Sequence, residues 1–236
     1  MLRLNRGLMV ALLLVAALTL SGCCGPLCSS LTRSVPEIST RRVTGSGALV
    51  TREMALEGFT KLEISSAFEV ELTQSSMYSV VITSDDNVAD DVRVTLSGDT
   101  LTIGLRPLSL TMGNVTLRAE ISMPRLEGAE LSGASRLEGY MDTEDVRFEL
   151  SGASRLVLEG DGGDLQLGAS GASQVDLSDF RVDNASLEVS GASQVTVYVT
   201  GRLDAEASGA SQVRYLGNPR MGRVESSGAS SVSPAD

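Results

Sequence analysis

The chain has 236 residues, a net charge of −11, 42% hydrophobic residues, no His and no Trp. It has enough apolar side chains for a folded core and the length of one or two domains, so it is not a disordered tail. The acidic balance, with Lys61 as the single lysine, argues against nucleic acid as a partner, and the lack of His excludes triads and metal sites that depend on imidazole.

Residues 1–22 have the pattern of a lipoprotein signal peptide. Arg3 and Arg6 precede an apolar stretch over residues 8–20, which is short for a permanent membrane span. Residues 20–23 read Leu-Ser-Gly-Cys, which resembles a bacterial lipobox. The resemblance implies cleavage before Cys23 and lipidation of that cysteine, which would hold the protein to a membrane; the alternative is an uncleaved anchor.

Residues 23–43 read as a lipidated N-terminus followed by a flexible tether. Ser, Thr, Arg and Pro dominate the segment from residue 29 to 43, which has no hydrophobic period. All three cysteines lie at 23, 24 and 28, so Cys24 and Cys28 could pair, stay free or be acylated. Cys24, in place of Asp, after the lipidated residue favours the outer membrane in a Gram-negative host.

Residues 44–126 predict an irregular N-terminal β part of the same fold. The segment Glu63–Leu72 superposes on Glu149–Leu158 as a degenerate copy. Further alternating segments are Ser79–Thr83, Val92–Leu96, Thr100–Leu105 and Val115–Ser122, with a hairpin turn at Ser97-Gly98-Asp99. Their irregular spacing predicts longer strands and a wider cross-section, which would cap the hydrophobic end of the regular repeats.

Residues 127–236 contain the regular repeat. The tetrapeptide Ser-Gly-Ala-Ser occurs six times, at intervals of 19, 19, 20, 18 and 19 residues. This period is too short for helical pairs or for a four-stranded propeller blade, and it suits one coil of a β-solenoid. Apolar and polar residues alternate on both sides of each copy, which indicates two short strands per coil. The sequence therefore predicts an all-β, single-stranded parallel β-helix with about 19 residues per coil.

The tetrapeptides are interpreted as structural corners. Gly can adopt the positive φ of a sharp bend, Ala is small enough to stack on its own kind, and the Ser hydroxyls can bond between coils. The corner residues are Ser132, Gly133, Ser151, Gly152, Ser170, Gly171, Ser190, Gly191, Ser208, Gly209, Ser227 and Gly228. Six copies without a nearby base argue against a catalytic serine, and no catalytic residue is predicted.

A row of glutamates precedes the corners: Glu130, Glu149, Glu188, Glu206 and Glu225. Stacked about 4.8 Å apart, they would repel one another unless Arg136, Arg155 and the matching Gln residues reach across. The row is either a solvated outer face or an acidic stripe for divalent cations or a basic partner. Acidic residues at 142, 145, 161 and 164 are expected in turns, but no copy matches the calcium-binding nonapeptide. No metal and no cofactor is predicted.

Several segments together resemble the bacterial head GIN domain family, the proposed heads of auto-transporter adhesins. They are Gly58–Ile64, the Ser-Asp-Asp-Asn at 84–87, Gly98–Ile103, Ile121–Pro124 and the Leu-Ser-Gly-Ala-Ser repeats. The resemblance covers about residues 43 to 232. It implies a parallel β-helix in an exported protein, often a lipoprotein, and it carries over no catalytic residues.

We therefore expect a membrane-anchored envelope lipoprotein, periplasmic or surface-exposed, with a non-enzymatic adhesin-like binding or scaffold domain. Its partners would be the membrane, through the lipid on Cys23, and an envelope polysaccharide or protein. The alternative is a polysaccharide lyase or hydrolase, since hydrolysis needs two carboxylates about 5 to 10 Å apart. The nearest local break in the repeat is Gly168, which replaces a row glutamate near Asp161 and Asp164.

Overall fold

The computed structural model describes residues 41–106 and 110–235. All regular structure in these two ranges is β-strand, as predicted. Within the same ranges, no helix is long and apolar enough to cross a membrane. The predictions for the signal peptide, Cys23 and the tether up to residue 40 lie outside the described residues.

The strands form an N-terminal part and a run of regular coils. The N-terminal part contains β1 (Arg41–Thr44), β2 (Leu49–Met54), β3 (Lys61–Ile64), β4 (Glu69–Gln74), β5 (Ser79–Asp85), β6 (Val92–Ser97), β7 (Thr100–Leu105), β8 (Leu110–Gly113) and β9 (Leu117–Met123). The regular coils contain β10 (Gly128–Leu131), β11 (Arg136–Tyr140), β12 (Val146–Leu150), β13 (Arg155–Ala169), β14 (Gln174–Val189), β15 (Gln194–Val199), β16 (Arg202–Ala207), β17 (Gln212–Leu216), β18 (Arg220–Ser226) and β19 (Ser231–Pro234).

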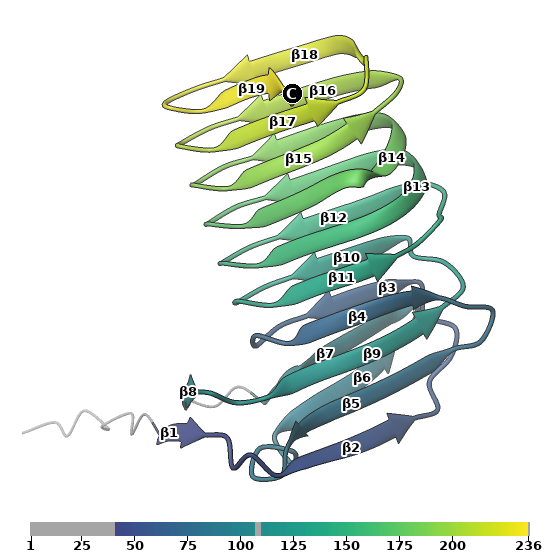
Figure 1. Ribbon diagram of the computed structural model, residues 1–236, viewed down its shortest axis with the longest axis vertical. Helices are drawn as coiled ribbons and strands as arrows, with labels where there is room; N and C mark the ends of the chain where they lie inside the picture. The colour runs from purple at the N-terminus through teal and green to yellow at the C-terminus, as the bar shows by residue number, and fades with distance from the viewer. Residues whose placement is uncertain (1–40, 107–109, 236) are drawn as a thin grey trace, which may run out of the picture. The chain divides into compact units, whose positions relative to one another are not determined.

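Each regular coil has a leading strand before the Ser-Gly-Ala-Ser corner and a trailing strand after it. Leading strands pair in parallel from β10 to β18, and trailing strands pair in parallel from β11 to β19. Figure 1 shows the coils stacked on one another, with the corners aligned along the left edge. Register partners such as Glu130 and Glu149 are 19 residues apart. This confirms the predicted parallel β-solenoid.

The core consists of side chains stacked in columns along the solenoid. One leading column runs through Leu62, Ala129, Phe148, Leu167, Leu187 and Ala205, all 4% exposed or less. The large ring of Phe148 has the small Ala129 as its neighbour, so volumes compensate between successive coils. Each buried Leu or Phe contributes about 1.5–3 kcal/mol by leaving water. The period-2 alternation of the sequence thus becomes the interior and exterior of the coil.

In the N-terminal part, the order of the strands in space differs from their order in the chain. The coil β3–β4 lies between β10 and β11 on one side and β7 and β9 on the other. The chain therefore forms one coil, adds the next layer on the side away from the repeats, and crosses back to begin the regular run. Antiparallel pairs of β2 with β5, β5 with β9, and β6 with β7 complete this end.

Two details predicted for this part are confirmed. Glu63 is the register partner of Glu130, so Glu63–Leu72 is a coil of the same kind as the repeats. The residues 97–99 join β6 to β7 in an antiparallel hairpin, and Gly98 has a φ of +61°.

Two other details are wrong. The acidic residues 161 and 164 are predicted to lie in turns, but they lie inside β13, where Asp161 pairs with Arg181 and Asp164 with Asn184 in the register. The longest strands are β13 and β14, with 15 and 16 residues, and not the strands of the N-terminal part. In β13 and β14 the backbone pairs around the bend as well as along the flat sides, with one register shift between Val157 and Glu159.

Candidate binding groove and the corner stack

The corner glycines have two separate reasons to lack a side chain. All six have φ between +72° and +77°, where L-residues are strained. In addition, a Cβ on Gly171 would lie 2.5 Å from the carbonyl oxygen of Gly152 in the coil below. That oxygen accepts a hydrogen bond from the backbone N–H of Ala172 at 2.7 Å, so it cannot move away freely. The corners are therefore joined between coils by backbone hydrogen bonds.

The second serine is buried in five of the six corners, and in every corner except that of Ser193 its hydroxyl is bonded within the same corner. The hydroxyl of Ser173, fully buried, donates to the carbonyl oxygen of Ser170 at 2.8 Å. The same bond occurs at 2.8 Å from Ser135, Ser154 and Ser211, and at 2.7 Å from Ser230. The expected ladder of hydroxyls between coils is thus mostly wrong, since the backbone makes the regular links between coils. The hydroxyl closes the bend.

A groove of about 860 Å³ runs across the outer side of the leading strands, beside the corners. Its lining repeats from coil to coil: the row glutamates Glu149, Glu188, Glu206 and Glu225, and the first corner serines Ser170, Ser190, Ser208 and Ser227. Glu130, the remaining glutamate of the predicted row, lies in register with Glu149 and lines a smaller neighbouring depression of about 130 Å³. The structure thus brings the predicted glutamate row and the predicted corners together on one surface.

Some glutamates of the row are paired with arginines that were not predicted from the sequence. Arg147 bonds Glu149 at 2.6 Å, and Arg223 bonds Glu225 at 2.8 Å, each from two residues earlier on the same strand. Residues two apart on a strand share a face, so the signal was present in the sequence. The predicted partners were wrong: Arg136 pairs with Glu138 because it lies beyond the corner, on a trailing strand.

Some carboxylates of the row remain without a cation. Among the described residues, no ion pair joins Glu130 or Glu188 to another side chain, and both are exposed. Nor do these residues contain a group of three or more His, Cys, Asp or Glu side chains that could hold a metal ion. The groove therefore offers spaced carboxylates and hydroxyls as hydrogen-bond acceptors and donors along its length.

The break in the repeat at Gly168 has a structural explanation. A Cβ at this position would collide with the carboxylate of Glu149, which lies over the glycine. Asp161 and Asp164, the nearby acids, are engaged elsewhere: Asp161 accepts from Arg181 at 2.7 Å, and Asp164 accepts from the side-chain amide of Asn184 at 2.8 Å.

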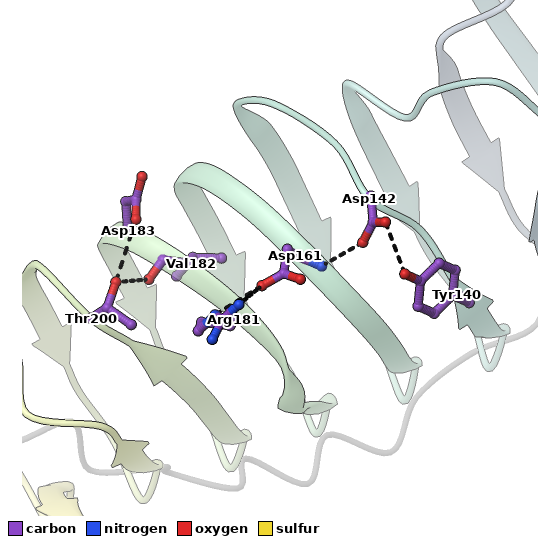
Figure 2. A network of polar contacts seen from close by, with 7 residues as sticks. All are labelled: Tyr140, Asp142, Asp161, Arg181, Val182, Asp183 and Thr200. Carbon is purple, nitrogen blue, oxygen red and sulfur yellow. Dashed lines mark hydrogen bonds and ion pairs between the residues drawn. The ribbon is translucent and has the colours of Figure 1, made fainter.

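Polar side chains link the coils on the side away from the corners, as Figure 2 shows. Asp142 accepts hydrogen bonds from the hydroxyl of Tyr140 at 2.8 Å and from the backbone N–H of Asp161 at 3.0 Å. The phenol's bond to that carboxylate raises the pKa of Tyr140. Asp161 in turn binds Arg181 of the next coil. These contacts hold neighbouring coils together.

Nearer the end of the repeats, Asp204 joins two coils through its carboxylate. Arg202 donates to it through two nitrogens at 2.7 and 2.8 Å, and the backbone N–H of Arg223 donates at 2.7 Å. These donors lower the pKa of Asp204 to about 2, from 3.8. The carboxylate thus serves to join two coils.

These features define an all-β solenoid with a repetitive, grooved outer surface. The family model of the "Putative auto-transporter adhesin, head GIN domain" matches residues 58–219. The chain belongs to this family, as the sequence motifs indicated. Membership supports an adhesin-like role and an exported location at the cell surface or in the envelope. No curated protein matches the chain.

Solved structures with the same fold include proteins from Bacteroides and Parabacteroides species. A "putative adhesin" from Bacteroides fragilis has 19% identity and a TM-score of 0.65, over 82% of this chain and 100% of its own. A "putative lipid binding protein" from Parabacteroides distasonis has 16% identity and a TM-score of 0.56, over 83% and 100%. A "putative adhesin" from Parabacteroides merdae has 16% identity and a TM-score of 0.51, over 83% and 99%. At these identities the likeness shows the fold alone.

Proposed function

We propose that this protein is a lipid-anchored envelope protein whose solenoid is a non-enzymatic, adhesin-like binding module. The observation that carries the proposal is the groove on the leading strands, which spans five successive coils and presents four row glutamates and four first corner serines. A surface that repeats every 4.8 Å or so suits a ligand that also repeats, such as an envelope polysaccharide or an extended protein segment.

A binding role fits the absence of assembled catalytic groups among the described residues better than an enzymatic one does. The acids near Gly168 are bonded to Arg181 and Asn184, and they serve to connect coils. Membership in a family of proposed adhesins also favours binding or scaffolding.

The groove is tested by reversing one of its free charges. Purified chain is titrated with envelope polysaccharide and protein fractions, and Glu188→Arg is compared with Glu159→Arg. Both glutamates are exposed and neither has an ion pair among the described residues, but Glu159 lies on a trailing strand outside the groove. We expect Glu188→Arg to weaken saturable binding at least about tenfold, equivalent to ~1.4 kcal/mol, and Glu159→Arg to leave it within about twofold. Equal effects, or no saturable binding to any fraction, would exclude the groove.

The anchor is tested separately through the N-terminal cysteines. Labelled palmitate should be incorporated into the wild-type chain and into Cys28→Ser, but not into Cys23→Ser. Protease treatment of intact cells then distinguishes a surface-exposed protein from a periplasmic one. Labelling of Cys23→Ser at the wild-type level would rule out the predicted lipidation site.

A further inference from the structure

The link between β1 and β2 is held against the body by a buried carboxylate. Asp85 is 1% exposed and is the only ionisable side chain among the buried described residues. Its carboxylate accepts hydrogen bonds from the backbone N–H of Gly47 at 2.6 Å and of Thr116 at 2.7 Å. These backbone donors, Thr116 first, lower the pKa of Asp85. A charge without a basic partner is thus stabilised by peptide groups of two other segments.

The two residues after Asp85 bind the same link. The side-chain amide of Asn87 donates to the carbonyl oxygen of Thr44 at 2.9 Å, and its oxygen accepts from the backbone N–H of Ser46 at 3.3 Å. Asp86 accepts from the hydroxyl of Ser46, and its backbone N–H donates to the carbonyl oxygen of Ala48 at 2.8 Å.

Gly45 shows how closely this link is held. A Cβ at that position would lie 2.5 Å from a carboxylate oxygen of Asp85 and 2.6 Å from the carbonyl oxygen of Asn114. Residues 44–48 are therefore bonded or packed at every position by the acidic turn at 85–87 and by the segment at 114–116.

The contacts of residues 44–48 lie at the point where a pulling force on the N-terminal segment would first act on the body. The chain from the N-terminus enters β2 at Leu49, whose register partner is Asp85, and β5 is the strand with which β2 pairs. Force applied through the N-terminal segment and directed away from β5 would open this pair one residue at a time, starting at Leu49. β1, ahead of it, pairs with β8 over four residues only, and a two-stranded sheet is marginal by itself. The polar contacts of residues 44–48 lie where such peeling would begin.

We propose that residues 44–48, Asp85, Asp86, Asn87 and Thr116 form a clamp that stops force on the N-terminal segment from peeling β2 off the body. The clamp rests on the proposed function, because an adhesin anchored through its N-terminus is pulled from that end. Several contacts must break together before the first residue pair between β2 and β5 can open. β2 therefore stays paired with β5, and the N-terminal end of the core stays shielded from water.

The test is constant-force spectroscopy on single molecules of the full chain. One handle is attached through the native cysteines at 23, 24 and 28. The other is attached at an exposed coil position, through Gln194→Cys, so that the coils beyond it carry no force. Release of residues 41–54 should give a first extension step of about 4–5 nm, at about 3.3–3.6 Å per residue. No ligand is present, so failure of the clamp and failure of the binding proposal are separate results.

Two variants change the clamp, and a third changes a similar carboxylate elsewhere in the chain as a control. Asp85→Asn removes the charge from the clamp, and Asn87→Ala removes two of its contacts without touching the buried carboxylate. Asp142→Asn changes a carboxylate that also accepts a backbone N–H, but in a regular coil. We expect the lifetime before the first step to fall at least about tenfold in Asp85→Asn and about threefold or more in Asn87→Ala, and to stay within about twofold of wild type in Asp142→Asn.

Two outcomes would overturn the clamp. One is a first step whose lifetime is unchanged in both clamp variants. The other is an equal shortening in Asp142→Asn. If Asp85→Asn fails to fold by circular dichroism, Asn87→Ala decides the question alone.

Discussion

The coil β3–β4 and the regular coils above it form the same corner in two different ways. In the regular corners Gly alone has positive φ, the sign pattern of a type II′ turn. In the coil β3–β4 both central residues, Ser66 and Ala67, have positive φ, at 66° and 64°, which is the pattern of a type I′ turn. Phe68, fully buried, stands where the repeats have a serine.

The difference comes from what lies beneath each corner. Each regular corner after the first rests on another of the same shape, so its glycine meets the carbonyl oxygen of the glycine below. Beneath the coil β3–β4, the chain leaves β7 at Leu105, whose backbone N–H donates to the hydroxyl of Ser66 at 3.2 Å. Here the position of the second corner serine is held by Phe68, whose side chain belongs to the hydrophobic core. Stacking of identical corners therefore requires Gly and Ser at these corner positions. The coil at the end of the stack can have other residues there.

The largest expected effect is at the residue that marks this end. Phe68→Ser gives the coil β3–β4 the serine of the repeats but removes a fully buried ring. We expect a loss of about 3–5 kcal/mol in the free energy of unfolding, measured by urea titration. A loss below about 1 kcal/mol would show that this corner tolerates the serine of the repeats. It would contradict the proposed difference between the two kinds of corner.

A pair of glycines separates backbone strain from stacking. Gly133 and Gly171 have almost the same φ, 77° and 76°, but a Cβ on Gly133 would be 3.4 Å from its nearest neighbour, the backbone nitrogen of Ser66. Both Ala variants should lose about 1–2 kcal/mol from positive φ. Gly171→Ala should lose about 1–3 kcal/mol more, because its Cβ would meet the carbonyl oxygen of Gly152. Equal losses on thermal or urea unfolding would contradict the stacking argument.

The buried corner serines allow a finer comparison within the repeats. Ser173 donates a hydrogen bond at 2.8 Å, whereas the buried hydroxyl of Ser193 has no partner among the described residues. Ser173→Ala should therefore cost about 0.5–1.5 kcal/mol, and Ser193→Ala should be neutral within about 0.5 kcal/mol or stabilising. The two values come from the same unfolding assay, and a larger loss at Ser193 would count against the assigned bonding.

The smallest expected effect is the loss of stability at low pH that comes from Asp204. The pKa of Asp204 is lowered to about 2 in the folded protein from 3.8. Its stabilisation is therefore fully present above about pH 4 to 5 and is lost as the pH falls through 4 to 2. The thermal midpoint should drop less steeply across that range in Asp204→Asn than in wild type. Identical slopes would mean that this carboxylate contributes no pH-dependent stability.

The pKa of Asp85 is also lowered, so its stabilisation also decreases in acid, but Asp85 lies in the N-terminal part. Its contribution should also vanish in acid, and amide hydrogen exchange should detect this first at Gly47 and Thr116, whose N–H groups it accepts. Protection of these two amides that stays constant down to pH 2 would argue against a charged clamp.

The sequence predicted the regular coils well because each of their constraints is local and repeated. The spacing of Ser-Gly-Ala-Ser gave the period, alternation gave the buried columns, and the copies aligned Glu130 with Glu149 as the structure has them. The groove was predicted only in part. Its glutamates and serines were identified, but the pairing of Arg147 with Glu149 was missed, although the two-residue spacing pointed to it.

The role of the Ser-Asp-Asp-Asn motif could not be obtained from the sequence. Its partners Gly47 and Thr116 are 38 and 31 residues away from Asp85. Nothing local relates a buried carboxylate to backbone N–H groups that the fold alone brings together.

The composition already excluded imidazole chemistry and nucleic acid, and the 19-residue period by itself determined the solenoid and its interior, because stacked coils place each residue on its own kind. Only the tertiary structure decided the order of the N-terminal strands, with β3–β4 between β10–β11 and strands that come later than it in the chain. There the strand pairs join segments that are far apart in sequence. Their stability depends on how these strands pack at the end of the stack, and no repeated local pattern encodes it. The clamp at Asp85 follows from that assembly, because its partners Gly47 and Thr116 belong to two other N-terminal segments.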